Sequence, residues 1–103
     1  MINVVVTMII KEGRMDDFRA VAAELAPKVQ AEKGCIAYDY TVDTESPLGS
    51  QEPVQPNRVT LLERWESPEA LQAHMASPHM KEFMPRLSEL RESATIRATS
   101  PLL

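Results

Sequence analysis

The sequence predicts an α+β domain of the ferredoxin-like type, in which helices cover one face of a four-stranded sheet. The first observation is the order of the patterned segments, which is β-α-β-β-α-β. The second is Pro78, which interrupts the last helical segment and so predicts a broken second helix. With 103 residues, the chain has the length of a single domain spanning residues 1–103.

Residues 2–10 are apolar almost throughout and rich in β-branched side chains, which is the pattern of a strand buried on both faces. Because helices would cover only one face, we expect the sheet of a second subunit to pack on the other, giving a dimeric α+β barrel. Gly13 ends this strand, and residues 15–31 have the spacing of an amphipathic helix. Pro27 lies inside this helix and predicts a kink or an early end. Gly34 suits the left-handed conformation that closes a helix.

The second and third strands are expected over residues 35–43 and 58–65, where side chains alternate between two faces. In the second strand, this alternation groups Tyr38 and Tyr40 with Ile36 and Val42, and Cys35 with Ala37, Asp39 and Thr41. In the third strand, one face carries Val59, Leu61, Glu63 and Trp65. The segment between the strands, at about 44–57, holds three prolines and several small polar residues, so it predicts a long, mobile loop.

Two Ser-Pro pairs mark the starts of two short helices. Ser67 is a candidate N-cap with Pro68 at the first helical position, which predicts a helix over residues 68–76. Ser77 and Pro78 repeat this signal before a second helix, expected from His79 to about Leu90. A short final strand is expected over residues 94–100.

The composition argues against several classes of function. A formal charge of -4 and the lack of any Lys and Arg cluster argue against nucleic-acid binding. Cys35 is the only cysteine, which excludes an intramolecular disulfide, and no signal-peptide pattern is present, so we expect a cytoplasmic protein. No apolar run reaches the roughly 18 to 20 residues of a membrane-spanning helix. No glycine-rich loop, Cys pair or HExxH spacing indicates a cofactor or a metal.

His74 is the best candidate for acid–base chemistry, because imidazole exchanges protons near physiological pH and the helix sets it beside apolar side chains. His74 and His79 are five residues apart across Pro78, a spacing that does not stack them on one helix face as metal ligands, so no metal site is expected. Glu63 interrupts an apolar row and needs a partner if buried. It is either a structural group held by a salt bridge or backbone donor, or an acid with a shifted pKa.

Four other side chains have two interpretations each. Trp65 is either a large core residue or the wall of a pocket. Tyr38 packs by its ring, with a hydroxyl that could reach a ligand. Asn3 either orients a ligand oxygen or satisfies nearby backbone groups. Cys35 has no basic neighbour in sequence, so we expect it to be buried and inert rather than nucleophilic.

Several short motifs resemble the antibiotic biosynthesis monooxygenase family. They are Gly34-Cys35 with Tyr38, Glu63-x-Trp65-Glu66-Ser67, Ala70, Ala73-His74 and Ser77-Pro78-His79-Met80-Lys81. The resemblance covers nearly the whole chain and is strongest to the bacterial quinol monooxygenases. It implies a homodimer that oxidises quinols or small phenols with molecular oxygen and without metal, flavin or haem. The implied catalytic residues are His74 as base and Trp65, with substrate contacts from Asn3, Tyr38, Glu63, Leu61, Leu71, His79 and Phe83.

Two other branches of that family fit less well. The polyketide-tailoring members carry an Asn and a Tyr where this chain has Leu61 and Leu71, and the residues used by haem-degrading relatives correspond to Val6, His74 and Met84. An isomerase of a small phosphorylated signal is an alternative that calls for Arg or Lys beside His74. A binding or stress-response dimer without turnover is a second alternative, favoured by a dry pocket sealed by side chains.

Overall fold

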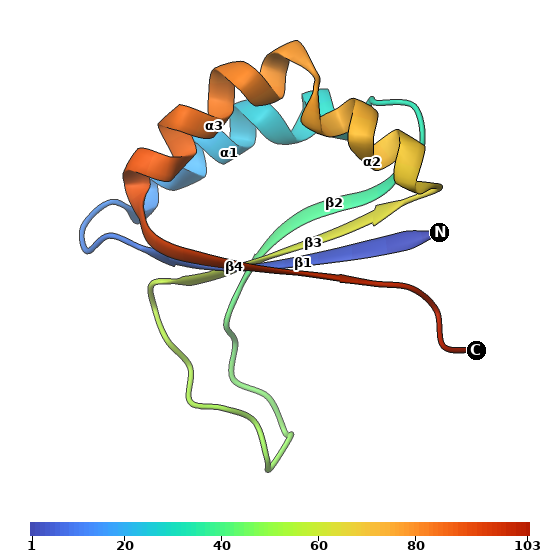
Figure 1. Cartoon of the computed structure of the whole chain (residues 1–103). Helices are drawn as coiled ribbons and strands as arrows, with labels where there is room; N and C mark the ends of the chain where they lie inside the picture. Colours follow the sequence, from blue (N-terminus) through green and yellow to red (C-terminus); the bar gives the residue numbers. More distant parts are fainter.

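The computed structural model describes all 103 residues and shows one sheet with helices over one of its faces (Figure 1). The strands are β1 (Ile2–Ile10), β2 (Cys35–Val42), β3 (Arg58–Trp65) and β4 (Arg91–Thr99), and the helices are α1 (Met15–Gln30), α2 (Pro68–Met75) and α3 (Pro78–Leu90). The strand order is β2-β3-β1-β4, and every neighbouring pair is antiparallel. These features confirm the predicted ferredoxin-like α+β fold. None of the helices has the length and apolar character that crossing a membrane requires.

Helix α1 packs on the sheet through the apolar face that its sequence predicts. Its buried residues are Phe18, Val21, Ala22, Leu25 and Val29. Asp16 and Asp17 in the first turn favour the helix start, because they lie near the positive end of the helix dipole. The helix runs past Pro27 to Gln30, so the expectation of an early end is wrong. Val29 is fully buried beyond the proline, and this packing offsets the missing backbone hydrogen bond.

The break between α2 and α3 follows the two predicted N-caps. The Ala70 N–H donates to Ser67 Oγ at 3.1 Å, and the Met80 N–H donates to Ser77 Oγ at 3.4 Å. The chain therefore changes direction at Ser77, and α2 lies over the end of β3 while α3 packs beside α1 (Figure 1).

The core lies between the sheet and the helices. In β1 it takes the alternate residues Val4, Val6, Met8 and Ile10, and in β3 it takes Val59, Leu61 and Trp65. The other face of β1, with Val5, Thr7 and Ile9, keeps partial exposure, so the strand is fully buried on one face only in this single chain. Leu62 of β3, on the same open face, is 44% exposed.

Two β-bulges depart from the alternation expected from sequence. In β2, Cys35 pairs with Trp65 and Ala37 with Arg64, so Ile36 is an extra residue that leaves the core row and is 48% exposed. Cys35 therefore shares the helix face with Tyr38, not the face of Ala37, and is only partly buried. Strand β4 begins at Arg91, three residues earlier than expected, because a second bulge continues its pairing with β1. Nothing in a period-two pattern marks such an inserted residue.

The long connection between β2 and β3 extends beyond the sheet on the side opposite the helices (Figure 1). Its base is anchored by Arg58, whose Nη2 lies 2.7 Å from the Asp43 carboxylate. The same carboxylate accepts the Gln55 N–H at 2.9 Å. These donors lower the pKa of Asp43 below its ordinary value, with Arg58 the largest cause. The connection is thus tied at its two ends.

Candidate active site

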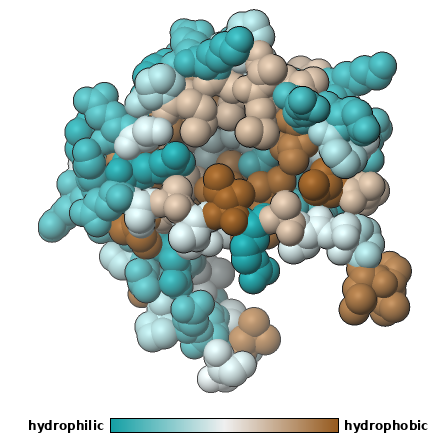
Figure 2. Space-filling model, viewed as in Figure 1, coloured by the Kyte–Doolittle hydropathy of each residue, from teal (hydrophilic) through white to brown (hydrophobic).

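A cavity of about 250 Å³ lies between the sheet and helices α2 and α3. Figure 2 shows the hollow between the helix layer and the sheet, with apolar residues around it. Thirteen of its sixteen lining residues are apolar or tyrosine, and the other three are Glu63, His74 and Arg91. Ile96 of β4 is 69% exposed at its side, so the cavity is open to ligands rather than sealed.

His74 is the buried base candidate of this cavity. It lies in the last turn of α2, is 3% exposed, and has its ring 4.6 Å from the Trp65 ring at an angle of 35°. Its Nδ1 lies 2.7 Å from Oε2 of Glu32, in the turn that follows α1. When Nδ1 donates its proton to this carboxylate, the free lone pair of the neutral imidazole is on Nε2. Every fully buried polar side-chain atom of the protein has a hydrogen-bond partner. The His74 Nε2 has no partner in the protein, so it is not fully buried, and it is accessible from the cavity that His74 lines.

Glu32 also joins His74 to His79. The Nε2 of His79, on α3, lies 3.0 Å from the same Oε2 of Glu32. Glu32 is not predictable as a site residue from the sequence, because it lies 42 and 47 residues from the two histidines and no local pattern relates them. The two histidines do meet at one point, although their spacing along the chain argued against it, because the Ser77 break sends their helices in different directions around the carboxylate.

These three residues are also the set that could hold a metal ion. Their nearest ligand atoms lie within 4.8 Å of one another. Two imidazole nitrogens and one carboxylate oxygen form a donor set suited to zinc or ferrous iron. The two His–Glu distances already have the length of hydrogen bonds. The Glu32 carboxylate therefore orients both histidines without needing a metal ion between them. The absence of a metal requirement stays a prediction.

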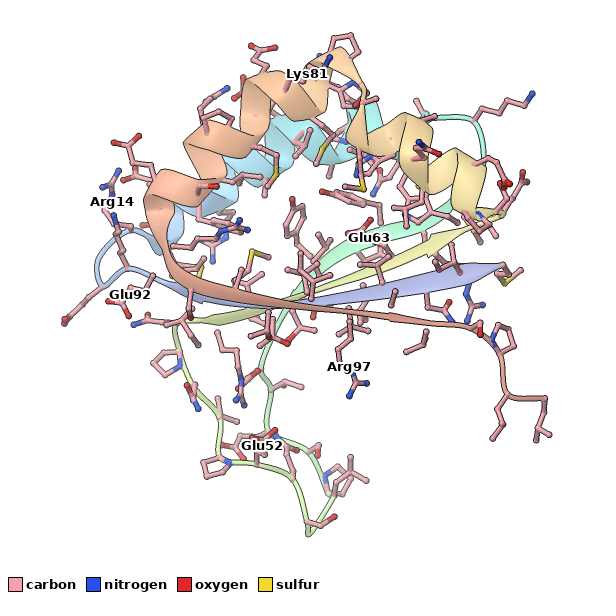
Figure 3. All side chains as sticks on the ribbon, in the orientation of Figure 1. Arg14, Glu52, Glu63, Lys81, Glu92 and Arg97 are labelled. Carbon is pink, nitrogen blue, oxygen red and sulfur yellow. The ribbon has the colours of Figure 1, made fainter.

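Glu63, which lines the cavity, forms a buried pair with Trp65 of the core. The Trp65 Nε1–H donates to Glu63 Oε1 at 3.0 Å, so the partner of Glu63 is an indole and not a salt bridge. Figure 3 shows Glu63 between the sheet and the helices. Burial raises the pKa of Glu63, and the Trp65 hydrogen bond and the nearby His74 only partly oppose this. Trp65 is fully buried and supports the cavity from behind Glu63 and His74.

The two tyrosines of β2 bond to each other. Their hydroxyl oxygens are 2.9 Å apart, and both rings line the cavity. Burial is the largest cause that raises the pKa of each hydroxyl. Tyr38 and Tyr40 therefore remain protonated and can serve as hydrogen-bond donors, but not as bases.

The structure brings together only part of the predicted site. Tyr38, Leu61, Glu63, Leu71 and His74 line the cavity. Four others do not: Trp65 and Phe83 are in the core, His79 reaches the site through Glu32, and Asn3 lies on the open face of the sheet. Asn3 Oδ1 accepts from Arg64 Nε at 2.8 Å, so its partner is a side chain and not one of the nearby backbone groups that the sequence suggested.

A larger hollow of about 470 Å³ lies between α1 and β2. It shares Tyr38 and Tyr40 with the cavity, but its charged residues, Arg19 and Asp39, are exposed. Because the larger hollow lacks a buried carboxylate or imidazole, the smaller cavity is the candidate site.

The fold, together with the Glu63-x-Trp65 motif of β3 and the Ala73-His74 motif of α2, defines the family to which the protein belongs. A family model described as "Antibiotic biosynthesis monooxygenase" matches residues 1–86, and the chain belongs to this family. The chain is similar to a protein named "Probable quinol monooxygenase YgiN" from Escherichia coli (strain K12), with 36% identity over 73 residues. This match covers 71% of the chain and 65% of the length of the relative.

Solved structures agree on the architecture. A conserved protein from Methanosarcina mazei Go1 has a TM-score of 0.82 and 28% identity, covering 95% of this chain and 89% of its own. A structure described as an antibiotic biosynthesis monooxygenase has a TM-score of 0.84 and 24% identity, with full coverage of both chains. At that identity, the second comparison supports the fold alone.

The buried state of Glu63 leads to a prediction about stability. Because folding raises the pKa of this carboxyl group, the native state binds its proton more tightly than the unfolded chain does. Stability is therefore lost as pH rises from about 4.5, the ordinary pKa, through the folded pKa. We expect Glu63→Gln, whose amide oxygen can still accept from Trp65, to raise the thermal midpoint at pH 7 and to leave it unchanged at pH 4. Exposed Glu82→Gln is the control, and a midpoint at pH 7 no higher than that of the wild type would contradict the assignment.

Proposed function

We propose that this protein is a cofactor-independent monooxygenase that oxidises a quinol or a small phenol with molecular oxygen. The observation that supports this most is the arrangement of His74, whose Nδ1 contacts Glu32 while Nε2 is accessible from an apolar cavity. A base that is oriented by a carboxylate and faces an apolar cavity suits the removal of a proton from an aromatic hydroxyl.

The proposed reaction needs no group besides the substrate and oxygen. His74 Nε2 takes the hydroxyl proton, and the Glu32 carboxylate stabilises the resulting imidazolium through Nδ1–H. The aromatic anion is electron-rich and reduces oxygen directly. One oxygen atom enters the ring and the other leaves as water, so that a quinol and O₂ give a hydroxyquinone and water. The hydroxyls of Tyr38 and Tyr40 supply hydrogen bonds nearby.

Two observations favour this proposal over its alternatives. A phosphorylated substrate would call for a cation beside His74. The cavity arginine, Arg91, instead contacts Met8 of β1, whereas Glu63, at the His74 end of the cavity, pairs with Val4 of β1. These two β1 positions are four residues apart, or about 13 Å along the strand. A binding module without turnover would be favoured by a sealed pocket, whereas this one is open and contains an oriented base.

The oriented base makes Glu32→Gln informative. We expect kcat to fall about 10- to 100-fold, because an amide can also donate to Nδ1 and so remove the lone pair from Nε2. Oxygen uptake at saturating quinol measures this loss. His79→Gln leaves the Glu32–His74 contact in place and should stay within about threefold of the wild type. Equal rates in all three proteins would show that the carboxylate does not orient the base.

Oxygen uptake by metal-stripped protein tests the proposed function itself. A panel of benzoquinols and naphthoquinols, each measured with and without protein in the presence of a chelator, should give at least one rate well above autoxidation. If activity appears only when zinc or ferrous iron is added, the cofactor-free reaction is wrong and Glu32, His74 and His79 form the metal site.

We also propose that the chain is a homodimer that packs through the open face of the sheet. Support comes from Val5, Ile9 and the 44% exposed Leu62 on that face, which a second sheet would cover. Light scattering should give about 23 kDa, twice the chain mass of 11.5 kDa. Leu62→Asp should give a monomer, whereas Ala23→Asp, on the helix side, should remain dimeric. A monomeric wild type would refute the dimer.

A further inference from the structure

Arg91 points into the cavity because of a bulge in β4. Ser93 pairs with Ile9 and Arg91 pairs with Ile10, so Glu92 is an extra residue in β4. With regular pairing, Glu92 would lie opposite Ile10, on the core face. The bulge puts a guanidinium there instead of a carboxylate, and Glu92 is exposed at the outside of the molecule (Figure 3).

No anion in the protein neutralises Arg91. Its Nη1 lies 3.5 Å from the sulfur of Met8, and its Nη2 lies 3.5 Å from the hydroxyl of Ser88. Both partners are neutral, and none of the ion pairs of the chain includes Arg91. A half-buried guanidinium at an apolar cavity gains most from a carboxylate, which accepts two parallel hydrogen bonds from it.

The cavity thus has two polar ends with apolar walls between them. His74 and Glu63 form one end, and Arg91 forms the other, at the level of Met8 on β1. Val6 and Leu61 line the space between these ends, together with the ring of Tyr40, which pairs with Leu61 and whose hydroxyl bonds to that of Tyr38. A ligand that matches this arrangement is apolar in its middle and polar at both ends.

We propose that the substrate is an aromatic hydroxy acid and that Arg91 binds its carboxylate. The hydroxyl group farther from the acidic chain then faces His74, and the carboxylate, on a short chain, extends from the ring toward Arg91. This assignment of the hydroxyl rests on the proposed function, whereas the carboxylate site of Arg91 does not depend on turnover. Arg91 is a specificity residue that selects quinols and phenols bearing an acidic substituent.

Ligand binding without oxygen tests this site separately from catalysis. The probes are 3-(2,5-dihydroxyphenyl)propanoate and its primary amide, which differ only at the chain end, where a neutral amide replaces the charged carboxylate. Trp65 is the only tryptophan and its ring lies 4.6 Å from that of His74, so its fluorescence reports occupancy in anaerobic titrations. The wild type should bind the acid at least about tenfold more tightly than the amide.

Variants then assign this preference to one residue. Arg91→Gln should bind acid and amide equally, and Arg91→Lys should keep part of the preference and so show that the fold is intact. Lys81→Gln is the matched control, because it removes the same charge from the outer surface of α3 (Figure 3) and should keep the full preference.

The outcomes separate this proposal from the proposed function. Equal binding of acid and amide by the wild type, no binding of either, or a preference that survives Arg91→Gln would overturn the Arg91 site. If the preference depends on Arg91 but neither the acid nor any quinol of the panel consumes oxygen above autoxidation, the monooxygenase proposal fails and the carboxylate site stands. If neutral quinols are turned over and the wild type shows no preference for the acid, the monooxygenase proposal stands and the Arg91 site is overturned.

Discussion

Replacing His74 with glutamine is expected to lower kcat for a quinol by about two orders of magnitude or more, because a positioned general base contributes 10²- to 10⁴-fold. The glutamine amide can still donate to Glu32, which lies 2.7 Å from the His74 ring nitrogen, so the partly buried carboxylate keeps a partner. The apolar cavity wall is otherwise unchanged, and KM should therefore change little.

Initial rates of oxygen uptake over a range of quinol concentrations measure both constants. A matched melting curve verifies the fold, and His79→Gln serves as the histidine control, because His79 lies outside the cavity. A His74→Gln variant with the kcat of the wild type would remove His74 from the reaction and leave the cavity without a base.

Gly34→Ala is expected to reduce the free energy of unfolding by about 2–4 kcal/mol, through backbone strain and steric overlap. Gly34 has φ of 85°, and a Cβ atom built there would lie 2.6 Å from the Cβ of Ala70 on α2. Gly34 also follows Glu32 closely and accepts the Glu66 N–H at 2.9 Å. A shift of this turn would therefore also disturb the Glu32–His74 contact.

Gly13 provides the control for this substitution. It has a similar φ of 76°, but a Cβ atom there meets nothing within 4 Å. Gly13→Ala should therefore cost only the conformational part, about 1 kcal/mol. Urea denaturation of both variants measures the difference, and equal losses would show that the approach of α2 to Gly34 is not tight.

The elements with strong local patterns were predictable from the sequence. The alternate residues of β3 reach the core as expected, and the Ser67 and Ser77 caps define the broken helix. Glu63 and His74 lie at the same cavity because β3 and α2, which carry them, are consecutive along the chain and joined by a short turn. Local patterns identify such residues since each side chain is oriented by the period of its own element.

The rest of the site depends on contacts between distant segments. Glu32 looks like an ordinary residue of a helix-ending turn, and only the packing of α2 and α3 brings two histidines to it. Arg91 was missed because the last strand was expected to start only at residue 94, whereas a bulge lets it begin at Arg91. Asn3 was assigned by its strand alone, and its face of the sheet turns out to be opposite the cavity. Such features require the tertiary structure.

The most direct test of a base-driven, cofactor-free monooxygenation is turnover of a quinol under ¹⁸O₂ by metal-stripped protein in the presence of a chelator. The account predicts a hydroxyquinone carrying one ¹⁸O atom, with the second atom in water and no accumulation of hydrogen peroxide. A parallel reaction in H₂¹⁸O corrects for exchange of quinone oxygens with solvent. Product without ¹⁸O, formed together with one equivalent of hydrogen peroxide, would contradict the account and indicate a simple quinol oxidase.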